Sequence, residues 1–270
     1  MREFQYVKAK SLSEAAAFIA AHPEAKLLAG GMTLIPTLKQ RLAQPSHLVD
    51  IGGLPDLHGI AVKGTLLEIG AAVRHHEVAS SPAVRKALPA LAFLAEHIGD
   101  PQVRNRGTLG GSLANNDPAA DYPAAVLALG ASITTNQRTI AADNFFTGMF
   151  ETALRSSEII TAVSFPVPRA AAYEKFRSPA SRYALVGVFV ARTQTGVRVA
   201  VTGAAPCVFR ATAMETALTE KFAPEALASI RTPSDGLNSD MHADAQYRAH
   251  LIGVLARRAV EKIVDAAAKR

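Results

Sequence analysis

The chain has 270 residues, of which 49% are hydrophobic and 19% are charged. This length allows a sizeable core and two domains, and the composition is typical of a folded protein rather than a disordered one. No apolar run reaches the roughly 20 residues that are needed to span a bilayer. The first residues, Met1–Gln5, lack the basic and then apolar plan of a signal peptide. We therefore expect a cytoplasmic protein with no membrane span.

The charge and the cysteine content exclude several classes of function. The formal net charge is +6, but the basic residues are scattered and tryptophan is absent, so the aromatic and basic pattern of a nucleic-acid surface is missing. Cys207 is the one cysteine, and one thiol cannot form an internal disulfide, a cysteine-rich zinc site or an iron–sulfur cluster. We interpret Cys207 as a small buried apolar side chain. Any redox chemistry would need a bound organic cofactor or the metals of a partner.

The first fifty residues alternate between short strands and helices, which predicts a βαβαβ-like unit. Ser11 and Glu14 form a capping box, in which Ser11 caps the helix and Glu14 reaches back to it. This helix carries Ala15 to Ala21 and ends before Pro23. The other elements of the unit are strands expected at 4–7, 26–29 (a buried strand) and 47–51, and a helix expected at 34–42.

A second unit is predicted up to Pro166-Val167-Pro168, where we place a domain boundary. Its strands are expected at 66–72, 132–134 and 159–165, its helices at 76–80, 82–98 and 123–129, and a turn-rich stretch at 107–112.

The remaining residues form a third part of different character. Two strands, 183–192 and 197–203, are joined by a hairpin signal at 194–196, and an amphipathic helix within 242–268 closes the chain. We expect a surface loop at 231–240. The predicted domains are thus 1–168, divided into subdomains at about 1–53 and 54–168, and 169–270.

Two pairs of adjacent glycines carry the strongest functional signal. Gly30-Gly31 lies between a predicted strand and a predicted helix, and Thr33 follows it. Gly110-Gly111 is flanked by Thr108 and Ser112. Paired glycines allow a tight turn that presents successive N–H groups to an anion, and a helix N-terminus adds a favourable dipole. Two such segments could hold a pyrophosphate from both sides, although each pair alone is more often an ordinary turn. Neither segment matches the Rossmann fingerprint or the P-loop.

The residues around both pairs resemble a known family. Residues 29–36, Ala-Gly-Gly-Met-Thr-Leu-Ile-Pro, resemble the first FAD loop of the medium subunit of bacterial carbon monoxide dehydrogenases and related enzymes of the xanthine dehydrogenase family. Residues 102–114 resemble the second FAD loop. The resemblance continues in order through 116–124, 173–176, 183–184 and 247–259, and so covers nearly the whole chain.

The resemblance implies an α+β fold and a set of binding residues. The fold would be an FAD-binding domain of two α/β subdomains, of the vanillyl-alcohol-oxidase (PCMH) type, followed by a C-terminal domain with a small antiparallel sheet and helices. The cofactor would be non-covalent FAD. Ile98 stands at a position that is aromatic in some relatives, and Arg182 replaces an acidic residue. The implied cofactor-binding residues are Lys26, Leu28, Ala29, Gly30, Gly31, Met32, Thr33, Leu34, Thr108, Gly110, Gly111, Ser112, Asp121, Ile160 and Lys175.

The implied function is electron transfer in a molybdenum-containing hydroxylase. Electrons would come from the iron–sulfur clusters of a partner, pass through FAD, and leave to an external acceptor. The implied partners are a small subunit with two [2Fe-2S] clusters and a large molybdopterin subunit, arranged as a dimer of heterotrimers. The substrate would bind to another chain, and neither it nor the acceptor follows from this sequence.

Two other functions compete with this one. Residues 110–114, Gly-Gly-Ser-Leu-Ala, approach the G-x-S-x-G nucleophile elbow, so that Ser112 would serve a serine hydrolase. The fifth residue is not glycine and the preceding residues make a poor strand. A cofactor-free binding module is the third interpretation. His75-His76 suggests a metal or flavin link, but neighbouring residues of a strand face opposite ways, and we expect surface or structural roles.

Overall fold

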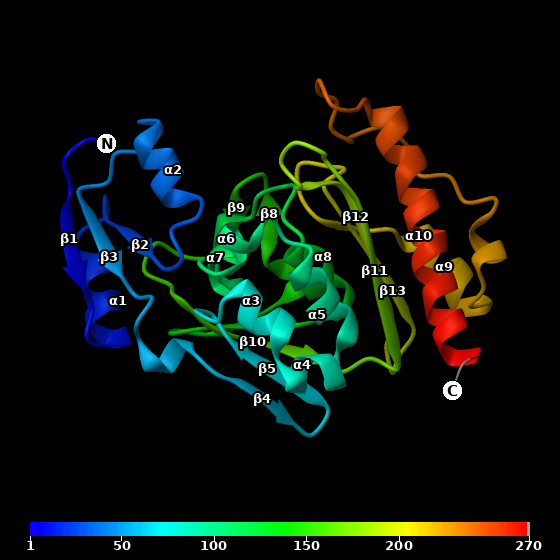
Figure 1. Cartoon of the computed structure of the whole chain (residues 1–270), viewed down its shortest axis with the longest axis horizontal. Coiled ribbons are helices and arrows are strands. Elements are labelled where there is room, and N and C mark those ends of the chain that lie inside the picture. Colours follow the sequence, from blue (N-terminus) through cyan, green and yellow to red (C-terminus); the bar gives the residue numbers. More distant parts are fainter. Residues whose placement is uncertain (269–270) are drawn as a thin grey trace.

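The structure, a computed structural model, describes residues 1–268. The chain begins with a small parallel sheet of strand order β1-β3-β2, which lies at one end of the molecule (Figure 1). The elements of this unit are β1 (Gln5–Lys8), α1 (Leu12–Ala21), β2 (Lys26–Leu28), α2 (Leu34–Lys39) and β3 (His47–Asp50). The predicted βαβαβ alternation is confirmed, since β3 pairs in parallel with both β1 and β2.

The capping prediction for the first helix holds with one change. The Ser11 hydroxyl accepts from the Glu14 N–H at 3.1 Å. The Glu14 carboxylate reaches back one residue further than expected and accepts from the Lys10 N–H at 2.7 Å.

The strand β2, predicted as buried, is exposed at Lys26 and half-buried at Leu27 and Leu28, because it is the edge strand of its sheet.

The second unit is built on an antiparallel sheet of order β4-β5-β10-β6-β7, beside a small β8–β9 hairpin. Its strands are β4 (Ile60–Lys63), β5 (Leu66–Gly70), β6 (Ser132–Thr135), β7 (Thr139–Ala141), β8 (Phe146–Gly148), β9 (Glu151–Thr152) and β10 (Ile160–Pro166). Six helices lie between β5 and β6: α3 (His75–Ser80), α4 (Pro82–Ala87), α5 (Pro89–Glu96), α6 (Pro101–Arg104), α7 (Leu109–Asn115) and α8 (Tyr122–Ala128). Short 3-10 turns occupy Pro55–Leu57 and Ala142–Asn144.

The third part is a four-stranded antiparallel sheet covered by helices on both faces. Its elements are β11 (Ala170–Arg177), β12 (Ala184–Arg192), β13 (Val197–Thr202), β14 (Phe209–Arg210), α9 (Thr212–Glu220), a 3-10 turn (Pro224–Leu227) and α10 (Ala245–Ala268). Eight of the nine residues of β12 are buried. Phe189 and Ala191 pack into the core of the second unit, while Val188 and Val190 pack into a second core with α10. The sheet therefore joins the second unit to the closing helices.

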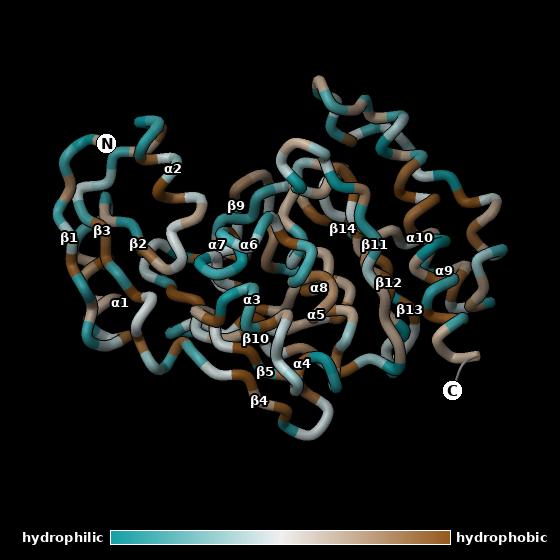
Figure 2. Tube along the Cα trace, in the orientation of Figure 1, coloured by the Kyte–Doolittle hydropathy of each residue, from teal (hydrophilic) through white to brown (hydrophobic). Residues whose placement is uncertain are grey.

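The distribution of apolar residues follows these contacts. Figure 2 shows apolar stretches where β5, α4 and α5 meet, and alternating apolar and polar stretches along α10. On α10, Leu251, Leu255 and Ile263 are buried against the sheet, which confirms the predicted amphipathic helix. Within residues 1–268, no helix combines the length and the apolar character that crossing a membrane requires.

Several sequence predictions need correction. The turn-rich stretch at 107–112 is in fact the entry into helix α7, with Thr108 as its N-cap. His75 and His76 open helix α3 and do not lie on a strand. The helix expected at 34–42 ends at Lys39. Strands β4, β7, β8, β9, β11 and β14 were not predicted.

Candidate functional site

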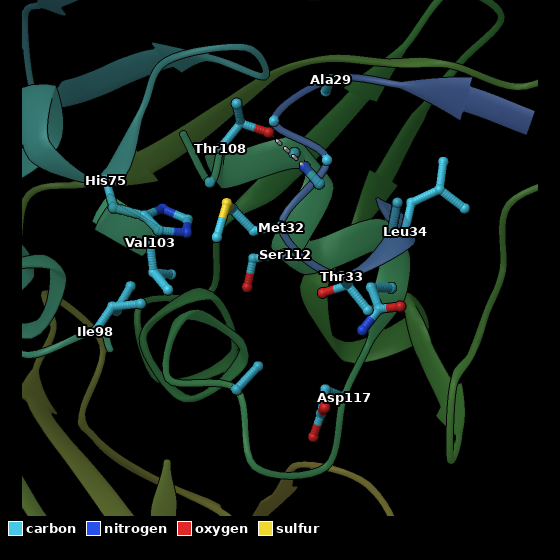
Figure 3. Close-up of a pocket in the computed structure, with 18 of the residues that line it drawn as sticks. Ala29, Met32, Thr33, Leu34, His75, Ile98, Val103, Thr108, Ser112 and Asp117 are labelled. Carbon is cyan, nitrogen blue, oxygen red and sulfur yellow. Dashed lines mark hydrogen bonds between the residues drawn. The ribbon is translucent and has the colours of Figure 1, made fainter. Parts of the chain in front are cut away.

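A cavity of about 700 Å³ lies where the N-terminal unit meets the second unit. Its volume falls within the range of small-molecule and cofactor sites. Both glycine pairs line it, although they are eighty residues apart in the sequence. Figure 3 shows Thr33 and Asp117 on one side of the cavity and His75, Val103 and Ile98 on the other. The fold thus brings together the two segments on which the anion-binding hypothesis rests.

The residues of the first glycine segment line this cavity, and their backbone donors are unused within residues 1–268. Among the hydrogen bonds of residues 1–268, none uses the backbone N–H groups of Gly30, Gly31, Met32 or Thr33. Gly31 has φ +74, a left-handed conformation that glycine adopts without strain. Gly30, Gly31 and Met32 are half-buried and Thr33 is exposed. A ligand that covers their N–H groups must provide acceptors, so this run suits a ligand that carries several acceptor oxygens, such as a pyrophosphate.

Gly30 has a different role from Gly31, because it allows two backbones to meet. A Cβ at Gly30 would collide with the backbone carbonyl of Arg106, which leads into the second glycine segment. Because Gly30 has no side chain, the two segments can lie in direct backbone contact. The first pair therefore consists of one glycine for close packing and one for a left-handed turn.

The second glycine segment is the first turn of helix α7, and its backbone donors are already engaged. Leu109 N–H donates to Val73 and Gly110 N–H to Ala71, at 3.0 and 2.8 Å. Gly111 N–H donates to the Thr108 hydroxyl at 3.1 Å, the cap seen in Figure 3. The expectation that both segments would present successive N–H groups is therefore wrong for this one.

The glycines and the hydroxyl of this segment still shape the cavity. A Cβ at Gly110 would lie 2.6 Å from the Ala71 Cβ, so Gly110 permits close packing of α7 on the sheet. Gly111 is exposed, and a Cβ there would meet only the Thr108 hydroxyl, at 2.8 Å. Ser112 lines the cavity, and Figure 3 shows its hydroxyl directed into it. This side contributes a bare backbone surface and a hydroxyl.

Asp121, which lines the cavity, forms a buried ion pair with Lys175. Asp121 lines the cavity, but its side chain is only 4% exposed. Its carboxylate accepts from the Tyr173 hydroxyl at 2.5 Å and from Lys175 Nζ at 2.9 Å. Burial raises the pKa of Asp121, while the Lys175 charge and the Tyr173 hydrogen bond oppose this rise. Lys175 does not line the cavity, and its ammonium group also donates to the His97 carbonyl at 3.1 Å.

His75 is a cavity residue that the sequence analysis assigned to the surface or to a structural role. It is 5% exposed, and its imidazole lies beside the ring of Tyr122, with the centroids 5.3 Å apart. Burial, together with the nearby Arg104 charge, lowers the pKa of His75 to about 4. The imidazole is therefore neutral at physiological pH. The ring of His75 also lies against the backbone of Gly107. This contact was not visible in the sequence, because it depends on how α3 packs on α6.

A second ion pair supports another part of the cavity wall. Glu158, which lines the cavity, accepts from Arg138 Nε at 2.6 Å. The Arg138 hydrogen bond lowers the pKa of Glu158 to about 2.

Fourteen of the fifteen residues implied by the resemblance line the cavity, all except Lys175, and Ile98 and Arg182 line it as well. Lining residues that the sequence analysis did not assign include Thr37, Ala71, Val103, Asp117, Leu154 and Tyr183.

Known families match both parts of the chain. Residues 2–168 match the family described as the FAD binding domain in molybdopterin dehydrogenase, and residues 171–263 match the CO dehydrogenase flavoprotein C-terminal domain. The chain belongs to the flavoprotein family of the molybdopterin dehydrogenases. This flavoprotein is 36% identical to the carbon monoxide dehydrogenase medium chain of Hydrogenophaga pseudoflava, over 95% of this chain and 96% of the relative. It is 37% identical to the nicotine 6-hydroxylase medium subunit of Paenarthrobacter nicotinovorans, over 98% of both chains.

Solved structures agree with these sequence matches. A carbon monoxide dehydrogenase structure from Hydrogenophaga pseudoflava matches the flavoprotein with a TM-score of 0.89 at 37% identity, over 98% of each chain. Quinoline 2-oxidoreductase from Pseudomonas putida 86 matches with a TM-score of 0.89 at 29% identity, also over 98% of each chain. The predicted α+β fold class and family are thereby confirmed.

The serine hydrolase alternative is not supported. Ser112 lies within helix α7, three residues after its first residue, and no strand leads directly into it as a nucleophile elbow requires. Among residues 1–268, no hydrogen bond joins the Ser112 hydroxyl to a histidine. His75, the histidine that lines the cavity, has its pKa lowered by burial and by the Arg104 charge, and no carboxylate contributes to this shift. The acid that orients the histidine of a catalytic triad is therefore missing as well.

Proposed function

We propose that this flavoprotein holds one non-covalent FAD in the cavity between its two glycine segments. The observation that carries the proposal is the run of backbone N–H groups from Gly30 to Thr33: these residues line the cavity, and their N–H groups have no partners among residues 1–268. An anion with several oxygens satisfies such a run, and the pyrophosphate of FAD has this chemistry. The bare surface at Gly111 lets that anion approach from the other side.

We assign the binding residues by what each can offer. The backbone of the first segment and the Ser112 and Thr33 hydroxyls would contact the pyrophosphate. Ile160 would give an apolar contact. The Asp121 carboxylate is occupied by Tyr173 and Lys175, so we propose that Lys175 acts through Asp121. The full proposed set is Lys26, Leu28, Ala29, Gly30, Gly31, Met32, Thr33, Leu34, Thr108, Gly110, Gly111, Ser112, Asp121, Ile160 and Lys175.

The reaction of this chain would be electron transfer, with FAD supplying the one- and two-electron redox chemistry. The task of the protein is to bind and orient the cofactor and to keep water from its buried side. Apolar residues that line the cavity, such as Ile98, Val103 and Leu57, would exclude water. No acid–base pair of this chain is required, because the substrate would react on another subunit.

We propose partners and organisation on the same basis. The relatives named above are the medium chain or medium subunit of their enzymes. We therefore propose a small subunit with two [2Fe-2S] clusters as electron donor, a large molybdopterin subunit, and a dimer of such heterotrimers in the cytoplasm. Within this chain we propose an FAD domain at 1–168, with subdomains at about 1–53 and 54–168, and a C-terminal domain at 169–270.

The cofactor proposal is tested by the purified protein itself. We expect flavin absorbance, and we expect acid precipitation to release FAD at one equivalent per chain. Colourless protein that also fails to bind added FAD would overturn the proposal. Affinity purification from the native host tests the partners, and recovery of this chain alone with full dehydrogenase activity would contradict the heterotrimer.

A further inference from the structure

His75 combines burial, position and unused hydrogen-bonding capacity in a way that the proposed site does not explain. Its Nδ1 is buried and has no hydrogen-bond partner among residues 1–268. None of the side-chain hydrogen bonds of that part of the chain uses Nε2 either. An imidazole that is 95% removed from solvent normally satisfies at least one nitrogen. The side chain thus lacks a partner that a ligand could provide.

The ring is placed so that only one nitrogen can reach the cavity. Because Nδ1 is enclosed by protein, Nε2 is the nitrogen that remains for a ligand. A Cβ on Gly107 would lie 2.5 Å from Nε2, which places this nitrogen against the backbone just before Thr108. Figure 3 shows the imidazole directed into the space that Met32 and Ser112 also face. Nε2 therefore lies at the junction of the two glycine segments.

Tyr122 lies beside His75 and does not fix the position of its proton. Its hydroxyl is buried and also lacks a partner among the described residues. Burial raises the pKa of Tyr122, so the hydroxyl stays protonated and can act as a donor. The two rings are neighbours, with centroids 5.3 Å apart, but no hydrogen bond joins this hydroxyl to Nδ1 within residues 1–268. An acceptor oxygen of a ligand at Nε2 would select the tautomer of neutral histidine that carries its proton on Nε2.

We propose that His75 is a further cofactor-binding residue, whose Nε2–H donates a hydrogen bond to an oxygen of the bound FAD. The acceptor is a non-bridging pyrophosphate oxygen or a carbonyl oxygen of the flavin ring, since both are acceptors of the same kind. This inference rests on the proposed binding of FAD in this cavity. It adds a side-chain donor to a site that otherwise depends on backbone N–H groups and hydroxyls.

The test compares two adjacent histidines of helix α3. His75→Leu removes the donor, and His76→Leu is the matched control, because His76 is exposed and does not line the cavity. We expect His75→Leu to weaken FAD binding about tenfold, as the loss of one hydrogen bond predicts, and His76→Leu to leave it unchanged. His75→Gln, which keeps a donor, should restore most of the affinity.

Fragments of the cofactor identify the acceptor. If His75→Leu weakens binding of ADP and FAD alike, the acceptor is the pyrophosphate, and if it weakens FMN and FAD but not ADP, the acceptor is the flavin. Nitrogen NMR of wild-type protein labelled in histidine gives a readout that does not depend on a variant folding. We expect neutral His75 with its proton on Nε2, and a shift of the Nε2 signal when FAD is added.

The possible failures separate this inference from the proposed function. If wild-type protein binds no FAD, the cofactor proposal itself fails. If wild-type protein binds FAD, but His75→Leu binds it equally well or the Nε2 signal does not move, the role of His75 is wrong and the cavity assignment stands.

Discussion

The two glycine segments look alike in sequence but use their glycines differently. In the first, Gly30 lets two backbones meet and Gly31 adopts a left-handed turn, and the N–H groups from Gly30 to Thr33 have no partners within residues 1–268. In the second, Gly110 packs against Ala71 and Gly111 opens the cavity wall, while the N–H groups are taken by the protein itself. The first segment is an anion cradle, and the second is a rigid wall that faces it.

This difference shows that a glycine pair does not by itself define an anion site. Both pairs provide close approach, but only one leaves donors for a ligand. The deciding factor is the tertiary environment. The carbonyls of Val73 and Ala71 accept from the N–H groups of the second segment. The first segment follows β2, the edge strand of its sheet, and has no neighbouring strand to pair with. Variants of each segment should therefore fail in different ways.

The largest effect is expected from Gly30→Ala. The added Cβ meets the Arg106 carbonyl, so the two segments must separate. Forced overpacking of this kind costs about 1–3 kcal/mol of unfolding free energy, and we expect FAD binding to be lost. Chemical denaturation and FAD titration measure both effects. Gly53→Ala is the matched control, because no atom lies within 4 Å of a Cβ at that position. Wild-type affinity in Gly30→Ala would contradict the close packing of the segments.

Acid should weaken the second segment through His75, which donates its backbone N–H to the Gly107 carbonyl at 3.0 Å. Folded His75 binds a proton only near pH 4, whereas the unfolded chain binds it near pH 6.5. The unfolded state holds more protons between these values, so the free energy of unfolding falls as the pH falls through this window, by up to about 3 kcal/mol. We expect His75→Gln to lose less stability than wild type between pH 6.5 and 4, and His76→Gln to match wild type. Equal slopes in all three proteins would argue against a buried neutral His75.

Gly111→Val changes the second glycine segment and leaves the first segment in place. A branched side chain would project toward the ligand and press on the Thr108 hydroxyl. We expect FAD affinity to fall about a hundredfold, which is about 2.7 kcal/mol, while stability falls by about 1 kcal/mol through the disturbed cap. Calorimetric FAD titration and thermal unfolding separate these two losses. A large loss of stability without a change in FAD affinity would mean that Gly111 serves only the helix.

The smallest effects are expected from the two hydroxyls. Ser112→Ala removes one hydrogen bond to a charged group from a half-buried position, and we expect a loss of about 1.5 kcal/mol of binding free energy. Thr33→Ala removes a more exposed hydroxyl that caps nothing on α2, so we expect a smaller loss. FAD dissociation constants for both variants provide the comparison. An equal effect, or a larger one for Thr33→Ala, would reverse our account of which hydroxyl faces the cofactor.

The sequence predicted those parts of the molecule whose signals are local. The βαβαβ unit, the β12–β13 hairpin and the amphipathic α10 have regular alternation or helical spacing, and the structure confirms them. The missed strands β7, β8, β9 and β14 have two or three residues each, too few to show a period. Strand β11 is longer, but its burial does not alternate, so only pairing with β12 defines it.

The parts of the site that are formed by the two glycine pairs could be predicted from the sequence. The two pairs identified both walls of the cavity from the sequence. The helical state of residues 109–115 was not predictable, because two glycines disfavour a helix and contacts with Ala71 and Val73 stabilise it. The enclosure of Asp121 by Tyr173 and Lys175 joins residues more than fifty positions apart, and it depends on how the C-terminal sheet packs on α8.

The central claim is that the N–H groups of the first segment bind the cofactor while those of the second segment bind the protein. Amide NMR of the isotope-labelled apoprotein during FAD titration tests it most directly. We predict that the Gly30, Gly31, Met32 and Thr33 signals move furthest, in the direction of stronger hydrogen bonding. The Leu109 and Gly110 signals, whose donors are already engaged, should move much less. Larger shifts at Leu109 and Gly110 than at Gly30–Thr33, or no shift at either segment when FAD binds, would contradict the account.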